Sequence, residues 1–590
     1  MSLSNEDRTR LTDQLVYLDK GNIINKLINL KNQHVDLSIR LVYLSVLSIL
    51  STTLGTPIYG TTDDNILAGF VDGSYTGERE KRLIFIRPLI GQILNKLQTA
   101  LPHLGIYSLF LLLMLVVSFS IFGTMITRRD ESPKIRKISQ ISWIALSSPA
   151  IIWFSQAPTY TAISILCTCL SLMSVFINII SNKRSYLLFI LAIILFILSF
   201  LVRPEGATGS ILLSILPLAY LAYKVRKIDL KKIILVTLIF IPIFIYDNYL
   251  QYSTSNSAWN KYDNWNNLRH QVQHRVAEDQ LLDLRVVNNW SIPEYHLFMD
   301  LSFGDERVFD KQWLKPAYEN TYFTRGVSGL VHSNPFTVIQ KIFDLLSKYY
   351  GVIVFQIILS IWIVVQRKST KIEKIICIMT TWTPVCLALY LMASNLHTPE
   401  RTLYPLLLLP NIFLLTQTKI FQDKLESNFS LKVWAPLLLF SIILCVFAPK
   451  GLAEQISLNH KQQKSATILR KELGTFGDQA IFIGPGNAEL YDRRNPYLVS
   501  AQWNIPRMIT SGNWETFSPY WYKRIEYLGL SGGSIYESLF SEKVYWLSFS
   551  VPDTSYMVEL FLKENGYPKT NRENVANFTH GETLFKFLPN

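Results

Sequence analysis

Charged side chains are scarce in this sequence. Asp, Glu, Lys and Arg make up 17% of the 590 residues, and hydrophobic residues make up 49%; a soluble protein usually carries about 25% charged residues. Uncharged stretches, such as the one that starts at Leu104, continue for about twenty residues or more, which is the length that crosses roughly 30 Å of hydrocarbon. The scarcity of charge therefore excludes an ordinary soluble protein and predicts a chain that crosses a membrane many times.

Cysteine is also rare, and no disulfide is expected outside the membrane. All of the cysteines fall within apolar stretches, and the closest pair lacks the spacing and polar surroundings of a zinc or redox site. No short apolar segment with a cleavage site follows the polar N-terminus, so the first spanning helix is expected to anchor the chain. The sequence predicts no metal or other cofactor, but it does not exclude a divalent cation. The cysteines are Cys167, Cys169, Cys377, Cys386 and Cys445.

The basic residues indicate an orientation. The net charge is +13, and the basic residues gather in short links after Thr127, at Asn182, after Tyr223 and after Val365. Short loops rich in Lys and Arg stay in the cytoplasm. They form no single surface interleaved with aromatic residues, so no nucleic-acid partner is expected. Starting from a cytoplasmic N-terminus, this bias predicts about eleven spans, near residues 39–57, 104–126, 140–156, 160–180, 186–202, 207–223, 233–251, 349–366, 375–393, 402–418 and 433–448.

The predicted fold is mainly α-helical: a polytopic membrane protein with a small extracytoplasmic α/β domain at its C-terminus. Residues 1–37 form a cytoplasmic segment, and residues 38–448 form the membrane part. The membrane part carries two long outer loops, 58–103 and 252–348, and residues 449–590 form the C-terminal domain. The odd number of spans places this domain outside.

Two local patterns support the outer pieces. Over residues 83–100, apolar residues recur at helical spacing, which predicts an amphipathic helix in the membrane interface. In the tail, strand-like stretches from Gln479 and from Lys543 alternate with helical stretches. This alternation predicts an α/β domain.

Ionisable residues beside apolar stretches are the candidates for chemistry, because charge at the edge of a membrane is costly. Asp63 and Asp64 follow the first predicted span. A carboxylate there could act as the general base on a hydroxyl group. Alternatively, the sequence from Thr61 is a helix N-cap, with a structural role alone.

Further candidates flank the later spans. His397, Glu400 and Arg401 open the tenth predicted span, where an Arg fork and a His donor suit a phosphate group. The alternative is a structural Glu–Arg pair beside an interfacial His. Arg203 and Glu205 could likewise form a structural pair at a helix end, and Arg87 could extend from its amphipathic helix to the interface.

Four stretches together resemble the GT-C superfamily of glycosyltransferases, which take sugars from polyprenyl-phosphate carriers. They are TTDDNILAGFVDG from Thr61, FIRPLIGQILNKLQTALPHLGIYSLFLLL from Phe85, VRPEG from Val202 and HTPER from His397. The resemblance covers most of residues 38–420. No WWD triplet is present, which argues against the oligosaccharyltransferase branch.

The resemblance implies a set of roles. Asp63 or Asp64 would deprotonate an acceptor hydroxyl for attack on the anomeric carbon, with inversion. Arg401, His397 and Arg87 would neutralise the departing lipid phosphate, with Arg203 and Glu205 as further substrate-binding residues. The partners would be a polyprenyl-phosphate-linked sugar, a hydroxyl acceptor on a glycan, lipid or protein, and the membrane lipid itself.

The tail offers a site for the acceptor. The stretch from Asn513 contains four aromatic rings suited to stacking on sugar faces, or to an ordinary core. They are Trp514, Tyr520, Trp521 and Tyr522.

Three competing functions remain. A lipid-linked polysaccharide polymerase or ligase would need a large outer loop richer in Arg than residues 252–348. A transporter or flippase of lipid-linked glycans would show polar residues in the middle of spans and inverted repeats. A receptor or scaffold is the third. The cysteine-free outer parts favour a bacterial plasma membrane.

Overall fold

The computed structural model describes residues 33–589 with internal gaps. The stretches outside the description are 1–32, 128–132, 181–184, 226–228, 276–284, 286–288, 325–339, 341, 345–349, 367–370, 394–399, 421–438, 440–442, 444–451, 487–494, 500–506, 531–532, 549–553 and 590. The eleventh predicted span lies almost entirely in these stretches.

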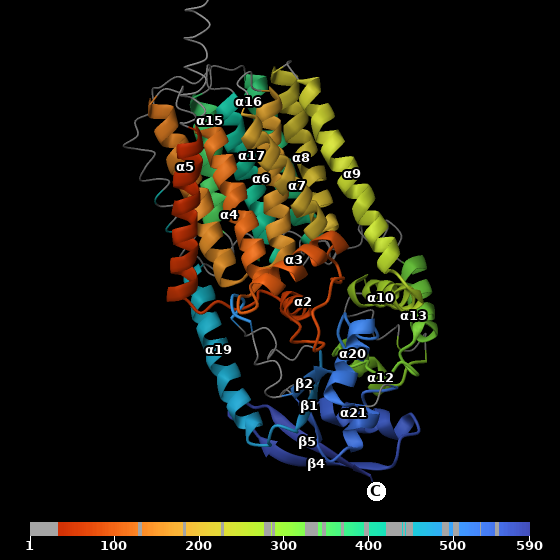
Figure 1. Ribbon diagram of the computed structural model, residues 1–590. Helices are drawn as coiled ribbons and strands as arrows, with labels where there is room; N and C mark the ends of the chain where they lie inside the picture. Colours follow the sequence, from red (N-terminus) through yellow and green to blue (C-terminus); the bar gives the residue numbers. More distant parts are fainter. Residues whose placement is uncertain are drawn as a thin grey trace, which may run out of the picture.

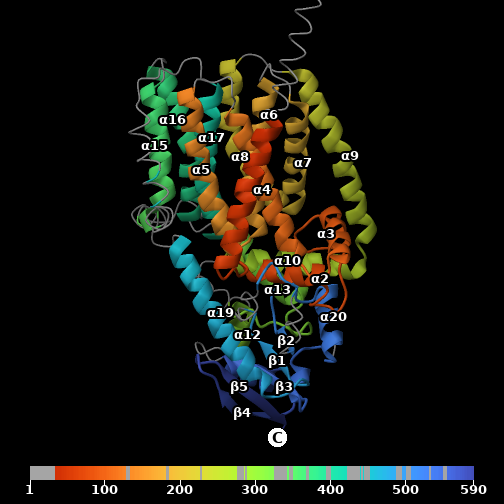
Figure 2. The ribbon, with the colours of Figure 1, turned by 60° about the vertical axis from the view of Figure 1, so that its left-hand side comes forward.

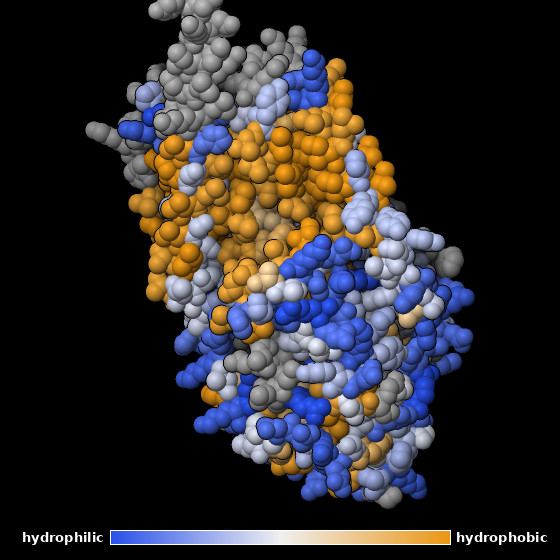
Figure 3. Space-filling view, viewed as in Figure 1, coloured by the Kyte–Doolittle hydropathy of each residue, from blue (hydrophilic) through white to orange (hydrophobic). Residues whose placement is uncertain are grey.

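A bundle of long helices forms the larger part of the molecule (Figure 1). Six described helices are long and apolar enough to cross a membrane, and a broad hydrophobic surface covers the face of the bundle that Figure 3 shows. The prediction of a mainly α-helical, multi-pass membrane protein is confirmed, whereas the count of eleven spans stays a prediction. The described helices of the bundle, which include these six, are Gln33–Leu54, α4 (Ile106–Ile126), α5 (Pro133–Gln156), α6 (Tyr160–Ile180), α7 (Tyr186–Val202), α8 (Pro204–Val225), α9 (Leu230–Thr254), α15 (Tyr350–Gln366), α16 (Lys371–Ala393) and α17 (Glu400–Ile420).

Helix α6 is the centre of the bundle and packs against α4, α7, α8 and α17. Its sequence is rich in Ser, Thr and Cys, small residues that let neighbouring helices approach closely in a membrane. The Ser164 hydroxyl donates a hydrogen bond to the Ser199 carbonyl (2.7 Å), and Thr168 Oγ1 lies 3.1 Å from Ser199 Oγ. These contacts fix the end of α7, where the candidate Arg203 follows.

Two short helices lie across one end of the bundle, between it and the C-terminal domain (Figures 1 and 2). They are α2 (Thr62–Asp72) and α3 (Pro88–Ala100). The predicted amphipathic helix is present as α3, but it begins at Pro88 because proline favours the first position of a helix. It buries Ile90 and Leu94 and exposes Leu97.

The second outer loop contributes α10 (Ser257–Arg275), α12 (Ile292–Met299) and α13 (Lys311–Thr324). Helix α10 packs against α13, and the rings of Trp290 and Trp313 stack with centroids 4.0 Å apart. A capping box between Ser291 and Glu294 starts α12. These helices lie against the C-terminal domain, where α12 packs against α21 and α10 against α20.

The C-terminal domain is built on a five-stranded sheet of order β2-β1-β3-β5-β4. Strands β2, β1 and β3 are parallel, and β5 and β4 add to them as antiparallel strands. The predicted α/β character is confirmed. The elements are α19 (Leu452–Gly474), β1 (Ile481–Gly484), β2 (Arg507–Thr510), α20 (Pro519–Leu528), η5 (Glu537–Phe540), β3 (Val544–Ser548), α21 (Thr554–Glu564), β4 (Thr570–Asn577) and β5 (Thr583–Pro589).

The segment after β2 leaves the carboxyl edge of the parallel strands and reaches the end of the bundle. The Tyr262 hydroxyl of α10 donates a hydrogen bond to the Trp514 carbonyl (2.7 Å). The Trp514 ring lies against Phe85, with centroids 4.9 Å apart, and against Phe70 of α2. We call the contact region between the segment 511–518, α10, α2 and Phe85 the junction. Ligands of parallel sheets usually bind outside the carboxyl ends of the strands, so a ligand site is expected at this junction.

Candidate functional site

Asp64 is a structural carboxylate at the start of α2. Its side chain is fully buried. Oδ1 accepts hydrogen bonds from the Tyr107 hydroxyl (2.8 Å) and the Tyr160 backbone N–H (2.9 Å), and Oδ2 accepts one from the Thr61 hydroxyl (2.6 Å). Burial raises the pKa of Asp64 to about 6, although these hydrogen bonds oppose the rise. Asp64 therefore fastens α2 to the first turns of α4 and α6.

Asp63 has different surroundings, although it is the neighbouring residue. Successive helical residues point about 100° apart, so Asp63 does not share the buried face of Asp64 and is only half-buried. Its charge acts on Arg269 of α10 and on Glu515, which follows β2. The N-cap expected from sequence is present, but Thr61 provides it. Of the two aspartates, Asp63 is the one that is not fully buried and whose charge acts on residues of α10 and of the C-terminal domain.

Arg203 and Glu205 form the pair that the sequence allowed. Arg203 ends α7, and Pro204 starts α8. Nε of Arg203 lies 3.1 Å from Oε2 of Glu205, which is largely exposed. The guanidinium lies over the rings of Phe85 and Tyr160, at 5.1 and 5.3 Å from their centroids. Its buried Nη1 has no hydrogen-bond partner among the described residues, so this donor is available for an anion.

The Arg87 side chain already binds residues of α9. Its Nε lies 3.3 Å from Oδ2 of the buried Asp247, and its Nη2 donates a hydrogen bond to Asn248 (3.3 Å). Its backbone N–H donates to the Leu201 carbonyl (2.9 Å), which places α3 beside the end of α7 and hence beside Arg203. The partner of Arg87 is the fully buried Asp247, whereas the partner of Arg203 is the largely exposed Glu205, so Arg203 is the better candidate for a phosphate.

The third predicted group stands at the start of α17, where few residues are described. His397 lies outside the described residues, and Glu400 and Arg401 are in the first turn of α17 with side chains that are not described. Helix α17 packs against α6 and α15. Their proposed role in phosphate binding therefore stays a prediction.

The aromatic residues of the tail divide between core and surface. Trp521 is fully buried against Phe517 and offers no ring face to an acceptor, so its assignment as an acceptor-binding residue is corrected to a core residue. Trp514 is buried as well and joins the C-terminal domain to Phe85 and Phe70.

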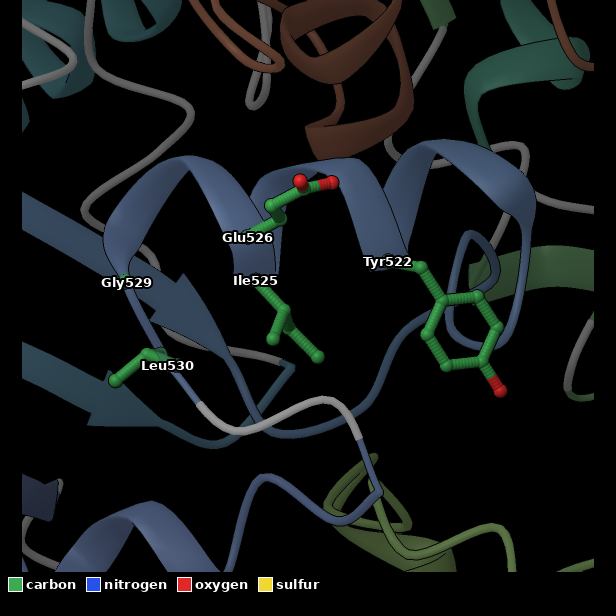
Figure 4. Close-up of a pocket in the computed structure, with 5 residues that line it drawn as sticks. All are labelled: Tyr522, Ile525, Glu526, Gly529 and Leu530. Carbon is green, nitrogen blue, oxygen red and sulfur yellow. The ribbon is translucent and has the colours of Figure 1, made fainter.

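Tyr522, by contrast, lines a pocket beside α20. The pocket has a volume of about 540 Å³, and Figure 4 shows the Tyr522 ring and the Ile525 side chain on the same side of the helix. Glu526, Gly529 and Leu530 complete its lining. An aromatic ring suits a sugar face, so Tyr522 replaces Trp521 as the candidate contact for an acceptor.

The sequence patterns did not predict two charged residues of the junction. Glu515 and Arg269 are both buried, and Tyr262 acts electrostatically with both of them. Each stands in a polar, aromatic-rich stretch whose local pattern gives no sign of its partner. Among the described residues, no three His, Cys, Asp or Glu side chains come together as a metal-binding group.

Comparisons with known proteins identify one similar structure. No protein-family model matches the sequence, and no curated protein matches it. The crystal structure of ArnT from Cupriavidus metallidurans in the apo state is similar over 93% of this chain and 97% of that chain. The sequence identity is 10% and the TM-score is 0.42, so this similarity carries no argument about substrate or mechanism.

Proposed function

We propose that this chain is a glycosyltransferase that moves a sugar from a polyprenyl-phosphate carrier to a hydroxyl acceptor. One observation carries the proposal: Arg203 and helix α2, which bears Asp63, both contact Tyr160 at the end of the bundle. The Tyr160 backbone binds Asp64, the neighbour of Asp63, and the Tyr160 ring lies beneath the Arg203 guanidinium. These contacts support a site with a carboxylate base and a cationic donor where apolar helices meet a polar domain.

Each group has one task in the reaction. Asp63 takes the proton of the acceptor hydroxyl, whose oxygen forms a bond to the anomeric carbon as the bond from that carbon to the phosphate oxygen breaks. Attack from the opposite face inverts the configuration. Arg203 stabilises the charge that develops on the departing polyprenyl phosphate, and Arg401 and His397 are proposed to assist it. The polyprenyl chain lies along the apolar surface near α3.

The orientation follows from the basic links. Helix α6 begins at Tyr160, beside Asp64, and ends at Ile180, just before the basic link at Asn182. Lys232, at the start of α9 and in the basic stretch after Tyr223, donates a hydrogen bond to the Asn178 carbonyl at this same end of α6. Because such links stay in the cytoplasm, the junction and residues 449–590 are proposed to be extracytoplasmic, with the membrane part at residues 38–448 in a plasma membrane. The acceptor is a glycan, lipid or protein that reaches the pocket beside Tyr522 from outside.

The two aspartates provide a matched test of the base. Purified protein in lipid nanodiscs is incubated with a panel of radiolabelled polyprenyl-phosphate hexoses and pentoses, and released polyprenyl phosphate is measured. Asp63→Asn should lower turnover about 10²–10⁴-fold, as expected for loss of a positioned base. Asp64→Asn should retain most of the activity, because an amide oxygen can still accept the Tyr107 and Tyr160 hydrogen bonds.

Arg203 and Glu205 provide a matched test of the phosphate site. Arg203→Met should weaken the binding of polyprenyl phosphate about 10- to 100-fold, the usual worth of a hydrogen bond to a charged group. Glu205→Gln breaks the same ion pair but keeps the guanidinium, so binding should change little. If Asp63→Asn and Arg203→Met both transfer sugar at the wild-type rate, the assignment is wrong. Movement of the lipid-linked sugar across the bilayer without transfer would instead identify a flippase.

A further inference from the structure

Phe85 has a backbone conformation that its side chain does not favour. It lies in the segment that leads into α3, and its φ angle is +69°. In this left-handed region the Cβ atom of an L-residue comes too close to a backbone carbonyl oxygen. Residues other than Gly therefore adopt it where the surrounding structure holds them, and such strained positions cluster at functional sites.

Burial in the hydrophobic core does not account for this strain. The neighbouring residues Leu83, Ile84 and Ile86 are all buried, whereas Phe85 is only half-buried. An apolar side chain gains stability from the area that it removes from water, and within this stretch the strained residue gains the smallest share. The particular groups that its ring contacts are therefore the better explanation for its conformation.

The Phe85 ring contacts two residues that lie far apart in the sequence. The guanidinium of Arg203 lies over it, 5.1 Å from the ring centroid, and the ring of Trp514 lies against it with centroids 4.9 Å apart and an interplanar angle of 53°. Two residues later, the Arg87 backbone N–H donates to the Leu201 carbonyl (2.9 Å), which holds the segment beside the end of α7. Phe85 thus connects the C-terminal domain to Arg203.

The contacts of Arg203 leave its orientation to the aromatic rings. Its carboxylate partner, Glu205, is largely exposed, and an exposed ion pair holds its geometry only weakly. Nη1 is buried and has no hydrogen-bond partner among the described residues. A planar guanidinium stacks favourably on aromatic faces, and the rings below Arg203 are those of Phe85 and Tyr160. These two rings therefore direct Nη1.

We propose that Phe85 is a positioning residue for Arg203. Its strained backbone holds the ring against the guanidinium, and Trp514 of the C-terminal domain supports the ring. The inference rests on the proposed function, in which Arg203 binds the phosphate of the polyprenyl carrier. Phe85 forms no bond to the substrate and acts through Arg203 alone, so contact with the C-terminal domain strengthens phosphate binding.

Two ligands separate this role from simple packing. Binding of polyprenyl phosphate and of polyprenol, which lacks the phosphate, is measured with purified protein in detergent. Phe85→Leu keeps an apolar side chain but removes the aromatic face, so we expect polyprenyl phosphate to bind about 3- to 30-fold more weakly and polyprenol to bind as before. Phe85→Tyr should restore phosphate binding, because it restores the ring.

The C-terminal sheet offers a matched control. The Phe585 ring is half-buried and lies 5.3 Å from the guanidinium of Arg572, so Phe585→Leu removes a similar contact away from the junction. It should leave the binding of both ligands unchanged.

Combined variants test whether Phe85 acts through Arg203. In the Arg203→Met background, Phe85→Leu should cause no further loss of polyprenyl phosphate binding, because the group that it positions is gone. Trp514→Leu should also weaken this binding, and Trp514→Leu combined with Phe85→Leu should bind no more weakly than Phe85→Leu alone. Losses that multiply in either pair would overturn the inference.

The remaining outcomes distinguish this inference from the proposed function. Wild-type binding of polyprenyl phosphate by Phe85→Leu, or an equal loss of polyprenol binding, would overturn the positioning role and leave Arg203 as the phosphate ligand. Wild-type binding of polyprenyl phosphate by Arg203→Met would instead overturn the phosphate site of the proposed function, whatever Phe85→Leu shows.

Discussion

At the scale of single residues, Asp63 and Asp64 show how one step along a helix changes the role of a carboxylate. Asp64 points into the bundle and accepts three hydrogen bonds that hold α2 in place. Asp63 is half-buried, and its charge acts on Arg269 and Glu515. The two residues carry the same side chain. Only their different positions around the helix make Asp64 structural and leave Asp63 as the proposed base.

Asp64 should give the protein a stability that depends on pH. Its pKa is raised from 3.8 to about 6 on folding, so the folded state holds the proton more tightly and stability falls as the pH rises from about 4 to 6. A shift of this size corresponds to about 3 kcal/mol. The difference in thermal midpoint between the wild type and Asp64→Asn, measured in detergent from pH 4 to 8, should fall across that window and then level off. A constant difference would contradict the assignment.

At the scale of elements, α3 is held to α9 by the ion pair of Arg87 and Asp247. Asp247 is fully buried, so removal of Arg87 leaves a buried charge without its partner. Such breakage typically costs about 3–5 kcal/mol. We therefore expect Arg87→Met to lower the thermal midpoint clearly. Arg87→Met combined with Asp247→Asn should recover much of the loss, and a double variant no more stable than Arg87→Met would exclude this coupling.

Two consecutive residues of α20 differ in burial, one in the core and one beside the pocket. Trp521 is fully buried, whereas the next residue, Tyr522, lines the pocket beside the helix. Trp521→Ala should destabilise the protein by about 3–5 kcal/mol, as for other large core aromatics. Tyr522→Ala should cost less stability and weaken use of the acceptor. Thermal unfolding and acceptor-dependent turnover of both variants test the division, and a stable Trp521→Ala protein with impaired acceptor use would reverse it.

At the scale of the whole molecule, ion pairs connect the C-terminal domain to the segments 58–103 and 252–348. Lys523 of α20 pairs with Glu80 of the first outer loop (2.9 Å). Arg307 of the second outer loop pairs with Asp305 and Glu537 (3.1 and 2.8 Å). The C-terminal domain is therefore connected to both loops.

This arrangement requires a defined topology. A cysteine at His580, which is exposed on the C-terminal domain, should react with an impermeant maleimide in intact cells. A cysteine at Lys371, the first residue of α16, should react only after the cells are opened, because the basic links stay inside. The wild type provides the background from the native cysteines. Labelling of the Lys371 position in intact cells would place the proposed site on the wrong side.

The sequence alone determined the class of the protein and the main elements. Long uncharged stretches have no stable place except in a membrane, and the tail pattern gave β1 near Ile481, β3 near Val544 and the helices around them. Spacing within one segment also predicted α3 and the Arg203–Glu205 pair. These are properties of neighbouring residues, which the local sequence contains.

Only the tertiary structure decided which of these residues meet. Arg87 binds Asp247, a residue 160 positions away, and Glu515 meets Tyr75, 440 positions away. The same packing buried Trp521, made Asp64 an anchor and left Asp63 at the junction. Burial and long-range charge depend on the arrangement of distant segments, and no local pattern records that arrangement.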